Sequence, residues 1–555
     1  MTAQLFENDI RYRFRPFVCG ALGLWQEEVM QRLRVASPRG LAPVYRSSSA
    51  TLWSTEPLQS WTADRQHGYF WAPLAIGSRP SSWHEAAGRR LAAGVVIEDQ
   101  VATVHTCALG LQDVYLRQVG DALYFAVRIA PLTRLDDAPL HTDWQAWASI
   151  FALAGPIGAT TPYTEIRRIE AATAWRVERG SATRLRFEPA WFDVSADPVP
   201  EPGQIVELIG QQLAGLNGDE PAISVTLSGG WDSRLLATVA RRCGRQRVRA
   251  WTSSVDDGLD LDIEFAGSVA KALDIQHEVI VPGSEAWLAD RRTVRERVQY
   301  QTWMHTWAMP LARRLHCRGE YVLDGLAGDI LLKSLHVDPD VVQADSPATA
   351  RRLLWNHLSD GRLAVPGGLA SGVVEFFEEA SRAAFDEATA HLDGHPAAPA
   401  LSVLLTRTAR AIGPLPGWLF GPEANVLMPF IHPEVITTAV RVPALRKIGG
   451  DFYRAVLANA EPTMATLPST NDPGPEPFAK MRRETTFSAL TAMADAISSA
   501  DTVCRLLGPS LQHKLRDRDA LRGIWRQPRE LRALQWASML AEWLNKKDNA
   551  VVGAV

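Results

Sequence analysis

The chain has 555 residues, a formal net charge of -4, and 22% charged and 46% hydrophobic residues. This length predicts about two to four domains and leaves room for a sizeable core. The near-neutral balance, without a Lys/Arg-rich run, argues against nucleic acid as the main partner.

The five cysteines are scattered without C-x-x-C spacing. This argues against a disulfide framework or a zinc site and favours a reducing compartment. The sequence has no stretch of about eighteen consecutive apolar residues, and its charged first 17 residues do not fit a signal peptide. We therefore expect a cytoplasmic protein that has neither a membrane nor nucleic acid as a partner.

Residues 1–195 are predicted to be rich in β-strands. Short segments with alternating apolar and polar residues flank the turns Gly120-Asp121 and Arg179-Gly180, which predicts two hairpins. One apolar face per strand is typical of a sheet that packs against another layer. Residues 143–153 are more helix-like.

The linker between the two halves is predicted at residues 195–203, where three prolines occur without apolar periodicity. This divides the chain into an amino-terminal domain, residues 1–198, and a carboxy-terminal domain, residues 204–548.

The carboxy-terminal half contains a strand, a glycine turn and a helix in succession. Residues 223–227 form an apolar run suited to a buried strand. Residues 228–230, Ser-Gly-Gly, interrupt it, and Asp232 and Ser233 suit a helix start. Backbone N–H groups of such a turn and the positive helix end favour an anion such as phosphate.

Alternating strands and helices follow this turn. Residues 248–252 and 277–281 are predicted strands around a helix at residues 262–273, which indicates a doubly wound parallel sheet. Ligands of such sheets bind beyond the carboxyl ends of the strands. Residues 301–315 are predicted to form a core-facing helix, and no metal role is expected for His305 or His316.

The sequence Ser-Gly-Gly-Trp-Asp-Ser at residues 228–233 resembles the SGGxDS pyrophosphate loop of the N-type ATP pyrophosphatases, which include asparagine synthetase. The resemblance implies an adenine nucleotide alpha hydrolase-like α/β domain that cleaves ATP between its α- and β-phosphates. It assigns Thr252, at a strand end, a place beside adenine; a mere strand end is an equal alternative. The other expected ATP-binding residues here are Ser228, Gly229, Gly230, Asp232 and Ser233, together with Gly325 of a second glycine turn.

A second glycine turn with a carboxylate, at residues 321–330, resembles the GxGSDE segment of asparagine synthetase, with Gly325 and Asp329 in register. Mg²⁺ prefers oxygen ligands and bridges carboxylates to phosphates, so Asp232 and Asp329 are predicted as the metal-binding and catalytic pair, with a plain turn residue as the alternative for Asp329.

The resemblance also indicates which lysine and arginine side chains are expected at the site. The register gives Gly450 where those relatives carry a catalytic lysine, and Lys447 is taken as its substitute, with a surface lysine as the alternative. Arg407 or Arg410 is expected to reach the pyrophosphate, and Arg410 is assigned to ATP binding; a solvated arginine is the alternative. The turn-rich residues 467–475 are expected to form either a lid or a plain loop.

Residues 120–126 and 161–169 look like the glutaminase half of asparagine synthetase. This implies an Ntn-hydrolase-like αββα sandwich, whose working members use a cysteine exposed after the initiator methionine. The chain begins Met1-Thr2, so we expect a scaffold domain without glutaminase activity.

Without ammonia, the nucleophile is expected to be an amine of the substrate. The sequence Ser-Gly-Gly-Trp-Asp-Ser-Arg, with Arg234, looks most like the lasso peptide cyclases. Those enzymes adenylate an Asp or Glu side chain of a precursor peptide and close a macrolactam with its amino terminus. The implied cofactors are ATP and Mg²⁺, and the implied partners are the linear core peptide, a leader peptidase and a leader-binding protein. A β-lactam synthetase-like or asparagine synthetase-like ligase and a non-catalytic, nucleotide- and peptide-binding scaffold remain as alternatives.

Overall fold

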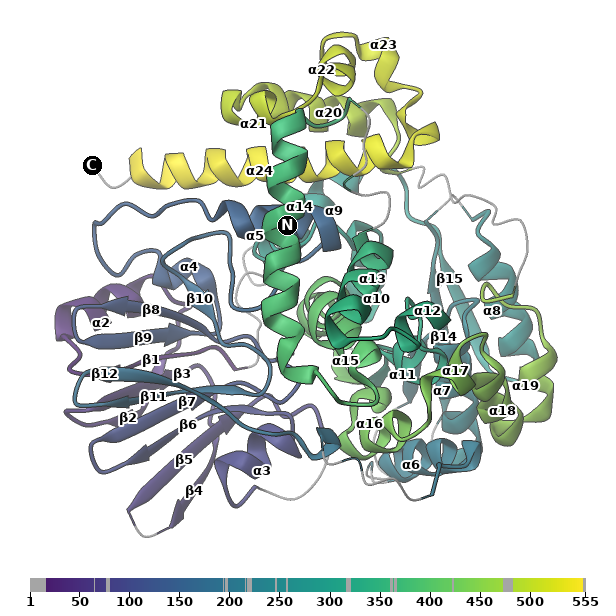
Figure 1. The fold of residues 1–555 in the computed structure, drawn as a ribbon, viewed down its shortest axis with the longest axis horizontal. Coiled ribbons are helices and arrows are strands. Elements are labelled where there is room, and N and C mark those ends of the chain that lie inside the picture. The colour runs from purple at the N-terminus through teal and green to yellow at the C-terminus, as the bar shows by residue number, and fades with distance from the viewer. Residues whose placement is uncertain are drawn as a thin grey trace.

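A computed structural model (Figure 1) describes most of residues 16–552. It leaves out residues 64, 76–79, 193, 195–197, 215, 217–221, 245–246, 256–257, 316–320, 360–362, 364–366, 422–423 and 473–482, and the side chains of 548–552. Met1, Thr2 and His316 therefore lie outside the described part of the chain. So do residues 195–197, at the start of the predicted linker.

Two six-stranded antiparallel sheets make up the amino-terminal half (Figure 1). The first has the order β10-β8-β9-β1-β3-β2 and the second β12-β11-β7-β6-β5-β4. The strands are β1 Val18–Gly23, β2 Ala42–Arg46, β3 Ala50–Ser54, β4 Gln59–Ala63, β5 Gln66–Trp71, β6 Ala93–Glu98, β7 Val101–His105, β8 Tyr115–Val119, β9 Ala122–Ala126, β10 Arg167–Arg168, β11 Thr173–Glu178 and β12 Ser181–Arg186.

One apolar core lies between the two sheets. It joins side chains of β1, such as Leu22, to side chains of β6 and β7, such as Ile97 and Val104. Helices α2 (Glu27–Val35) and α4 (Ile129–Leu132) contact the first sheet, and α3 (Trp83–Gly88) contacts the second. The expected αββα sandwich is confirmed.

Both predicted hairpins form. Strand β8 pairs with β9, and β11 pairs with β12. Gly120, Arg179 and Gly180 all adopt positive φ at these turns, a conformation that glycine reaches without steric cost. The predicted helix at residues 143–153 is α5, Trp144–Leu153, and the Asp143 side chain caps it by accepting from Ala146 N.

A five-stranded, all-parallel sheet organises the carboxy-terminal half, in the order β15-β14-β13-β16-β17. This confirms the predicted α/β class. The strands are β13 Ile223–Thr226, β14 Val248–Ser253, β15 Gln276–Ile280, β16 Tyr321–Leu323 and β17 Asn425–Leu427.

Helices cover both faces of this sheet. Val225 and Ala250 belong to the core that contains α7 (Trp231–Cys243), whereas Trp251 packs with Val294 of α9 (Trp287–Arg297) on the other face. The other helices near the sheet are α6 Pro202–Ala214, α8 Leu261–Ala272, α10 Met309–Leu315, α11 Gly328–Lys333, α12 Pro339–Val342, α16 Pro433–Val440, α17 Ala444–Lys447, α18 Asp451–Ala460 and α19 Pro462–Thr466.

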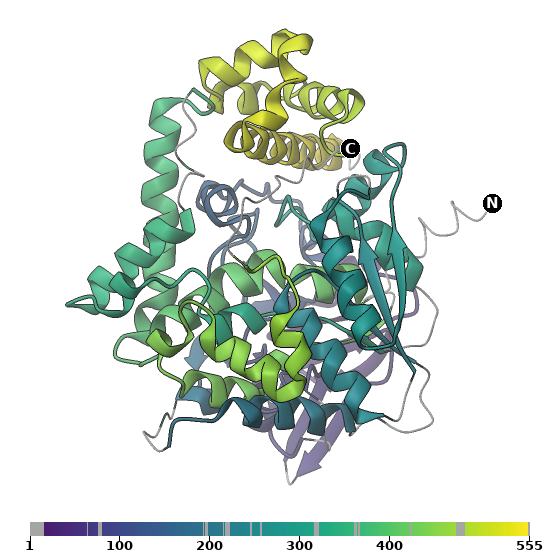
Figure 2. The same ribbon diagram turned by 90° about the vertical axis from the view of Figure 1, so that its right-hand side faces the viewer.

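A helical layer lies above the sheets in Figures 1 and 2. Its long helix α24 (Pro528–Val552) contacts the amino-terminal half, where Trp536 Nε1 donates to Trp147 O (3.2 Å). The remaining helices of this region are α14 Ser371–Thr389, α20 Phe487–Ser498, α21 Asp501–Leu506, α22 Pro509–Arg516 and α23 Arg518–Leu521. Helix α13 (Pro347–Ser359) lies below them in Figure 1 and contacts α12 and α5.

The predicted helix at residues 301–315 is shorter than expected. A 3₁₀ turn, Thr306–Ala308, leads into α10 at Met309. His305 has φ 76°, so the right-handed helical path cannot run through it. Helix α15 (Ala398–Val403) continues into π-helical turns, η4 (Leu404–Ile412) and then η5 (Leu415–Phe420).

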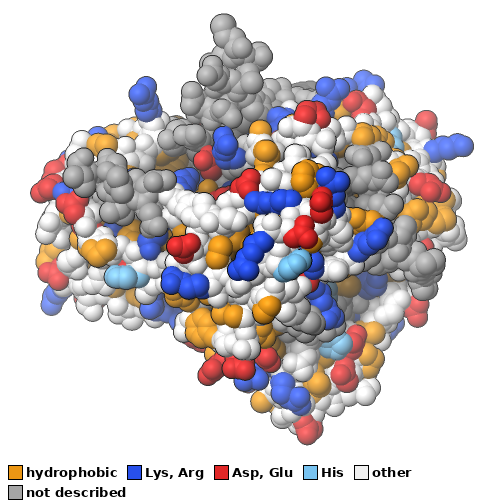
Figure 3. Space-filling view, turned by 90° about the horizontal axis from the view of Figure 1, so that it is seen from above, with side chains coloured by type: hydrophobic (Ala, Val, Ile, Leu, Met, Phe, Trp, Pro, Cys, Tyr) orange, Lys and Arg blue, Asp and Glu red, His pale blue; other side chains and the backbone are white. Residues whose placement is uncertain are grey.

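No helix in the described part of the chain is long and apolar enough to span a bilayer. On the face shown in Figure 3, cationic and anionic side chains intermingle. The two predicted domain boundaries remain predictions. Helix α6 begins at Pro202, so the last two residues of the predicted linker are helical.

Candidate active site

The glycine loop, residues 228–233, connects β13 to α7 at the carboxyl end of the central strand. It is folded on itself: Ser228 N donates to Ser233 Oγ (3.0 Å), and Gly230 N donates to Ser228 Oγ (3.2 Å). Extended backbone at Gly230 lets α7 begin at Trp231. The predicted residues Ser228, Gly229, Gly230 and Ser233 are therefore brought together in one turn.

Two further N–H groups of the glycine loop bind side-chain oxygens from other elements. Gly229 N donates to Asp262 Oδ1 (2.7 Å) at the start of α8, and Trp231 N donates to Asn471 Oδ1 (3.2 Å). The loop thus presents donors to oxygen ligands, and one acceptor is a carboxylate. This is the chemistry expected of an oxyanion site.

Residues 467–472 lie against the glycine loop. Thr470 N donates to Gly229 O (3.1 Å), and a Cβ on Gly229 would come within 2.8 Å of Thr470 Cγ2. Arg234, 0% exposed, donates to the carbonyls of Met464, Leu467 and Pro468. Arg234 therefore holds this segment in place beside the loop.

The two predicted acids, Asp232 and Asp329, meet across the loop ends of β13 and β16. Asp232 Oδ2 accepts from Asp329 N (3.1 Å), and its Oδ1 accepts from Tyr453 Oη (2.6 Å). A Cβ on Gly325 or on Gly328 would lie 2.7 Å from atoms of Asp232. Both glycines are thus needed for the close approach of the two loops.

A third carboxylate, Asp324, directly follows β16 and was not identified from sequence. Burial raises its pKa to about 6. The pKa of Asp232 is raised first by burial and then by the charge of Asp329, with Asp324 adding to it. Burial also raises the pKa of Asp329. The signal that could have revealed Asp324 is its place directly at a strand end.

The acidic site faces two cations that shift the pKa of Asp329 downward, Arg407 and Lys333. The Lys333 ammonium also lies 5.3 Å from the Trp231 ring centre, and the Arg454 guanidinium lies 5.1 Å from it. The Trp231 ring of the glycine loop therefore lies within cation–π distance of two positive charges.

Lys447 is buried, which lowers its pKa to about 8. Its ammonium donates to Ala439 O (3.1 Å), a carbonyl of α16 and not of the glycine loop. Its assignment as the catalytic lysine stays a prediction, and Lys333 is the lysine whose charge acts on Asp329.

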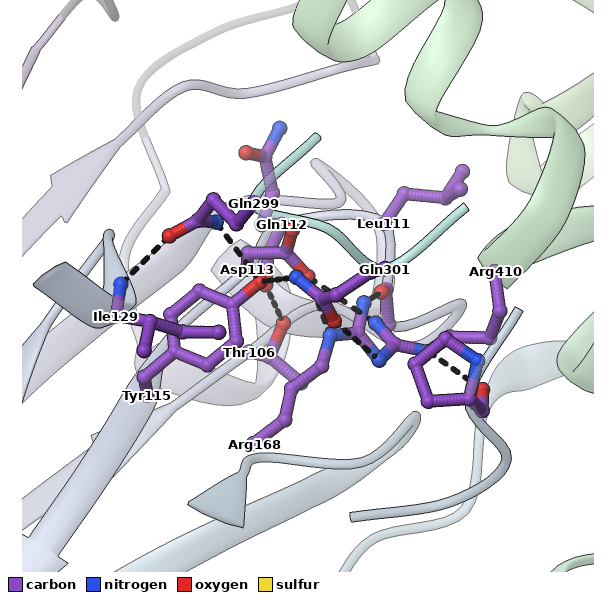
Figure 4. Close-up of polar contacts among 12 residues, drawn as sticks. Thr106, Leu111, Gln112, Asp113, Tyr115, Ile129, Arg168, Gln299, Gln301 and Arg410 are labelled. Carbon is purple, nitrogen blue, oxygen red and sulfur yellow. Dashed lines mark hydrogen bonds and ion pairs between the residues drawn. The ribbon is translucent and has the colours of Figure 1, made fainter. Parts of the chain in front are cut away.

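The structure does not bring Arg410 to the glycine loop. Its guanidinium donates to Pro156 O and Gln301 Oε1 and pairs with Asp113 (3.4 Å), which also binds Arg168 (Figure 4). These partners come from the junction of the two halves. The assignment of Arg410 to ATP therefore has to be corrected: its side chain is a buried anchor between domains.

Thr252 lies near the carboxyl end of β14. Its hydroxyl donates to Leu227 O (2.7 Å) and contacts His277 Nε2 (2.8 Å). These contacts connect three neighbouring strands at the edge where ligands bind. Its proposed place beside adenine remains a prediction.

The donor set at Asp232 and Asp329 fits a divalent cation such as Mg²⁺. The Asp232 carboxylate lies against the backbone N–H of Asp329. Burial disfavours the charged form of both acids, and the charge of Asp329 adds to this effect at Asp232; a hard cation with oxygen ligands relieves such repulsion. Among the described residues, a separate cluster of Asp338, Asp340 and His357 is exposed on the surface, and we assign it no role.

Comparison with known proteins gives one family match. The family model described as asparagine synthase matches residues 209–397. This match supports the asparagine synthetase-like superfamily for that segment and, in general, an ATP-dependent amide-forming ligase. No curated protein matches the chain.

Solved structures share only distant similarity with the chain. Glutamine phosphoribosylpyrophosphate amidotransferase from B. subtilis, complexed with ADP and GMP, is 10% identical, covers 48% of this chain and 90% of its own, and has a TM-score of 0.22. NMN synthetase from Francisella tularensis is 16% identical, with 34% and 96% coverage and a TM-score of 0.19. The allosteric regulatory enzyme of purine biosynthesis is 10% identical, with 49% and 75% coverage and a TM-score of 0.20. Such low scores carry no argument about activity.

Proposed function

We propose that this chain is an ATP-dependent, AMP-forming ligase of the lasso peptide cyclase type. The observation that carries the proposal is the meeting of Asp232 and Asp329 beside the glycine loop. Two partly buried acids, one of which accepts a hydrogen bond from the backbone of the other, next to a glycine loop suit the Mg²⁺ complex of a nucleoside triphosphate. Mg²⁺, when bound there, would neutralise charge on the phosphates.

The chain's own residues would divide the work. The glycine loop would bind the pyrophosphate portion of ATP once phosphate oxygens replace Asp262 and Asn471 as acceptors of the Gly229 and Trp231 N–H groups, while Tyr453 holds Asp232 in place. A substrate carboxylate oxygen would attack the α-phosphorus, and the bond to the β-phosphate would break to release pyrophosphate. The substrate's amine would then attack the acyl carbon, releasing AMP and one proton, with proximity of the two groups as the main source of acceleration.

The choice of a peptide cyclase over other ligases is supported by the motif resemblance around Arg234 and Asp329. The described cysteines of the amino-terminal half support an amine source other than glutamine hydrolysis. Cys19 and Cys107 are both buried, and burial raises their pKa, to about 12 for Cys19. Neither can serve as the thiolate nucleophile that glutamine hydrolysis requires.

The experiment is incubation of the full chain with ATP, Mg²⁺ and linear peptides that carry an internal Asp or Glu. We expect AMP, pyrophosphate and a peptide product lighter by one water. The Asp232→Asn variant should lose this activity, and Asp519→Asn, which changes an acid with an exposed side chain on α23, should retain it. Formation of ADP, or full activity of Asp232→Asn, would refute the proposal.

A further inference from the structure

Two backbone N–H groups of the glycine loop, those of Gly229 and Trp231, donate to side chains from outside the loop. Their acceptors are Asp262 Oδ1 (2.7 Å) and Asn471 Oδ1 (3.2 Å). Each N–H carries a single hydrogen, so a phosphate oxygen can bind it only after the present acceptor has left. These donors of the loop are therefore occupied by oxygen atoms of the chain itself.

Asn471 belongs to a compact turn, residues 469–472, which we call the strap. Ser469 N donates to Asp472 Oδ2 (2.8 Å), and Asn471 N donates to Ser469 Oγ (3.0 Å). Thr470 and Asp472 are exposed, and Asn471 is half-buried. Because these bonds lie within the turn, the strap can leave the glycine loop as one unit without losing them.

The strap fills the space that the two glycines of the loop leave open. A Cβ on Gly229 would lie 2.8 Å from Thr470 Cγ2, and a Cβ on Gly230 would lie 3.4 Å from Asn471 Oδ1. Thr470 N also donates to Gly229 O (3.1 Å). Glycine permits a ligand to approach the backbone closely, and here the strap lies where such a ligand would lie.

The segment before the strap is held more firmly than the strap itself. Arg234, 0% exposed, donates to three backbone carbonyls within residues 464–468. The strap has one ion pair to another element, between Asp472 and Arg454 (2.9 Å), and both side chains are partly exposed. Ion pairs of this kind contribute little. Residues 464–468 therefore provide a fixed base from which the strap can move.

The amide oxygen of Asn471 is a weaker acceptor than a phosphate oxygen. Hydrogen bonds to charged acceptors are roughly twice as strong as those between neutral groups. A pyrophosphate group would therefore take the N–H of Trp231 from Asn471. When the pyrophosphate leaves, the same N–H can bind Asn471 again and close the loop.

We propose that Asn471 is an internal ligand of the glycine loop and that nucleotide displaces it together with the strap. The identity of the displacing ligand, the pyrophosphate portion of ATP, rests on the proposed function. Apparent affinity is reduced by the fraction of molecules whose site is competent to bind, and the strap sets that fraction. It differs from a lid because it opens, and does not close, when nucleotide binds.

The first test is calorimetric titration of Mg-pyrophosphate, and of a non-hydrolysable ATP analogue with Mg²⁺, into wild type and Asn471→Ala. Loss of one competing hydrogen bond should make the variant bind about two- to tenfold more tightly. Asn471→Asp should bind more weakly than wild type, because a carboxylate holds the N–H more strongly and repels phosphate. Asn425→Ala, which changes an exposed asparagine at the amino end of β17, is the matched control and should behave as wild type.

Two results of this titration would overturn the inference. An affinity of Asn471→Ala equal to that of wild type would mean that Asn471 does not compete with the ligand. A weaker affinity of Asn471→Ala would make Asn471 part of the occupied site.

A second measurement follows the strap directly, through hydrogen exchange of the Thr470 amide with and without the ATP analogue and Mg²⁺. Faster exchange in the bound state supports displacement, because the amide loses its bond to Gly229 O. Slower or unchanged exchange overturns it.

Neither measurement requires a peptide or AMP formation, so the two proposals fail separately. If no peptide yields AMP, the proposed function fails, whereas tighter binding by Asn471→Ala still supports the inference about the strap. If neither wild type nor Asn471→Ala binds Mg-pyrophosphate or the analogue, the inference about the strap is overturned.

Discussion

Tyr453 offers a direct test of how Asp232 is positioned. Its hydroxyl donates to Asp232 Oδ1 at 2.6 Å, and its ring, 0% exposed, contacts Trp231 edge-on with ring centroids 5.5 Å apart. Tyr453→Phe removes the hydroxyl and preserves the ring. The change therefore tests one hydrogen bond without opening a cavity.

The expected magnitude follows from this geometry. A hydrogen bond to a charged group contributes about 1.5–3 kcal/mol. Asp232 is only partly buried and retains the N–H of Asp329 at its other oxygen, so we take the lower limit. About 1.5 kcal/mol corresponds to roughly a tenfold weaker Mg-ATP affinity.

The assay is calorimetric titration of Mg-ATP into wild type, Tyr453→Phe, Asp232→Ala and the double variant. If Tyr453 acts through Asp232, its loss should cost little once Asp232 is absent. An equal loss of affinity in both backgrounds would refute the reasoning, because Tyr453 would then act on the nucleotide independently of Asp232.

Three further predictions concern charge in the folded protein. Asp329→Asn should raise the thermal midpoint, because it relieves repulsion with Asp232, while lowering AMP formation at least about 100-fold; a lower midpoint in calorimetric scans would contradict this. Arg410→Met should lower the midpoint by several degrees, since removal of one buried partner costs about 3–5 kcal/mol and Asp113 would lose a partner; an unchanged midpoint would remove its anchoring role. Burial lowers the pKa of His105 to about 4, below the unfolded value of about 6.5. As the pH falls through this window, the unfolded state takes up a proton that the folded state does not, so the free energy of unfolding decreases. Between pH 7.5 and 5.5 this costs about 1.4 kcal/mol, and His105→Asn should show a flatter pH dependence of the midpoint; parallel curves would contradict the assignment.

Local patterns in the sequence were sufficient for much of the fold. The hairpin around Gly120 and the strand, glycine turn and helix around Ser228 each depend on residues that are close in the chain. Period-two alternation and glycine positions determine such elements without reference to distant contacts. The pairing of Asp232 with Asp329 followed from the resemblance of both glycine turns to asparagine synthetase and from the preference of Mg²⁺ for oxygen ligands.

Distant contacts were decided only by the tertiary structure. Tyr453 reaches Asp232 across 221 residues, and Asn471 reaches Trp231 across 240. No periodic pattern specifies such contacts, because they depend on how α18 and residues 467–472 pack against α7. Sequence therefore identified the acids but not the groups that orient them.

The choice between Arg407 and Arg410 shows the same division. The sequence placed both arginines on one helical segment and favoured Arg410. The orientation of that segment, with Arg410 directed at Pro156, Gln301 and Asp113, is set by its π-helical turns and by the close approach of Gly155 to its backbone. The sequence thus determined that both arginines lie on one segment, and the packing of the two halves decided that Arg410 is buried at their junction, because only packing fixes the rotation of the segment that carries them.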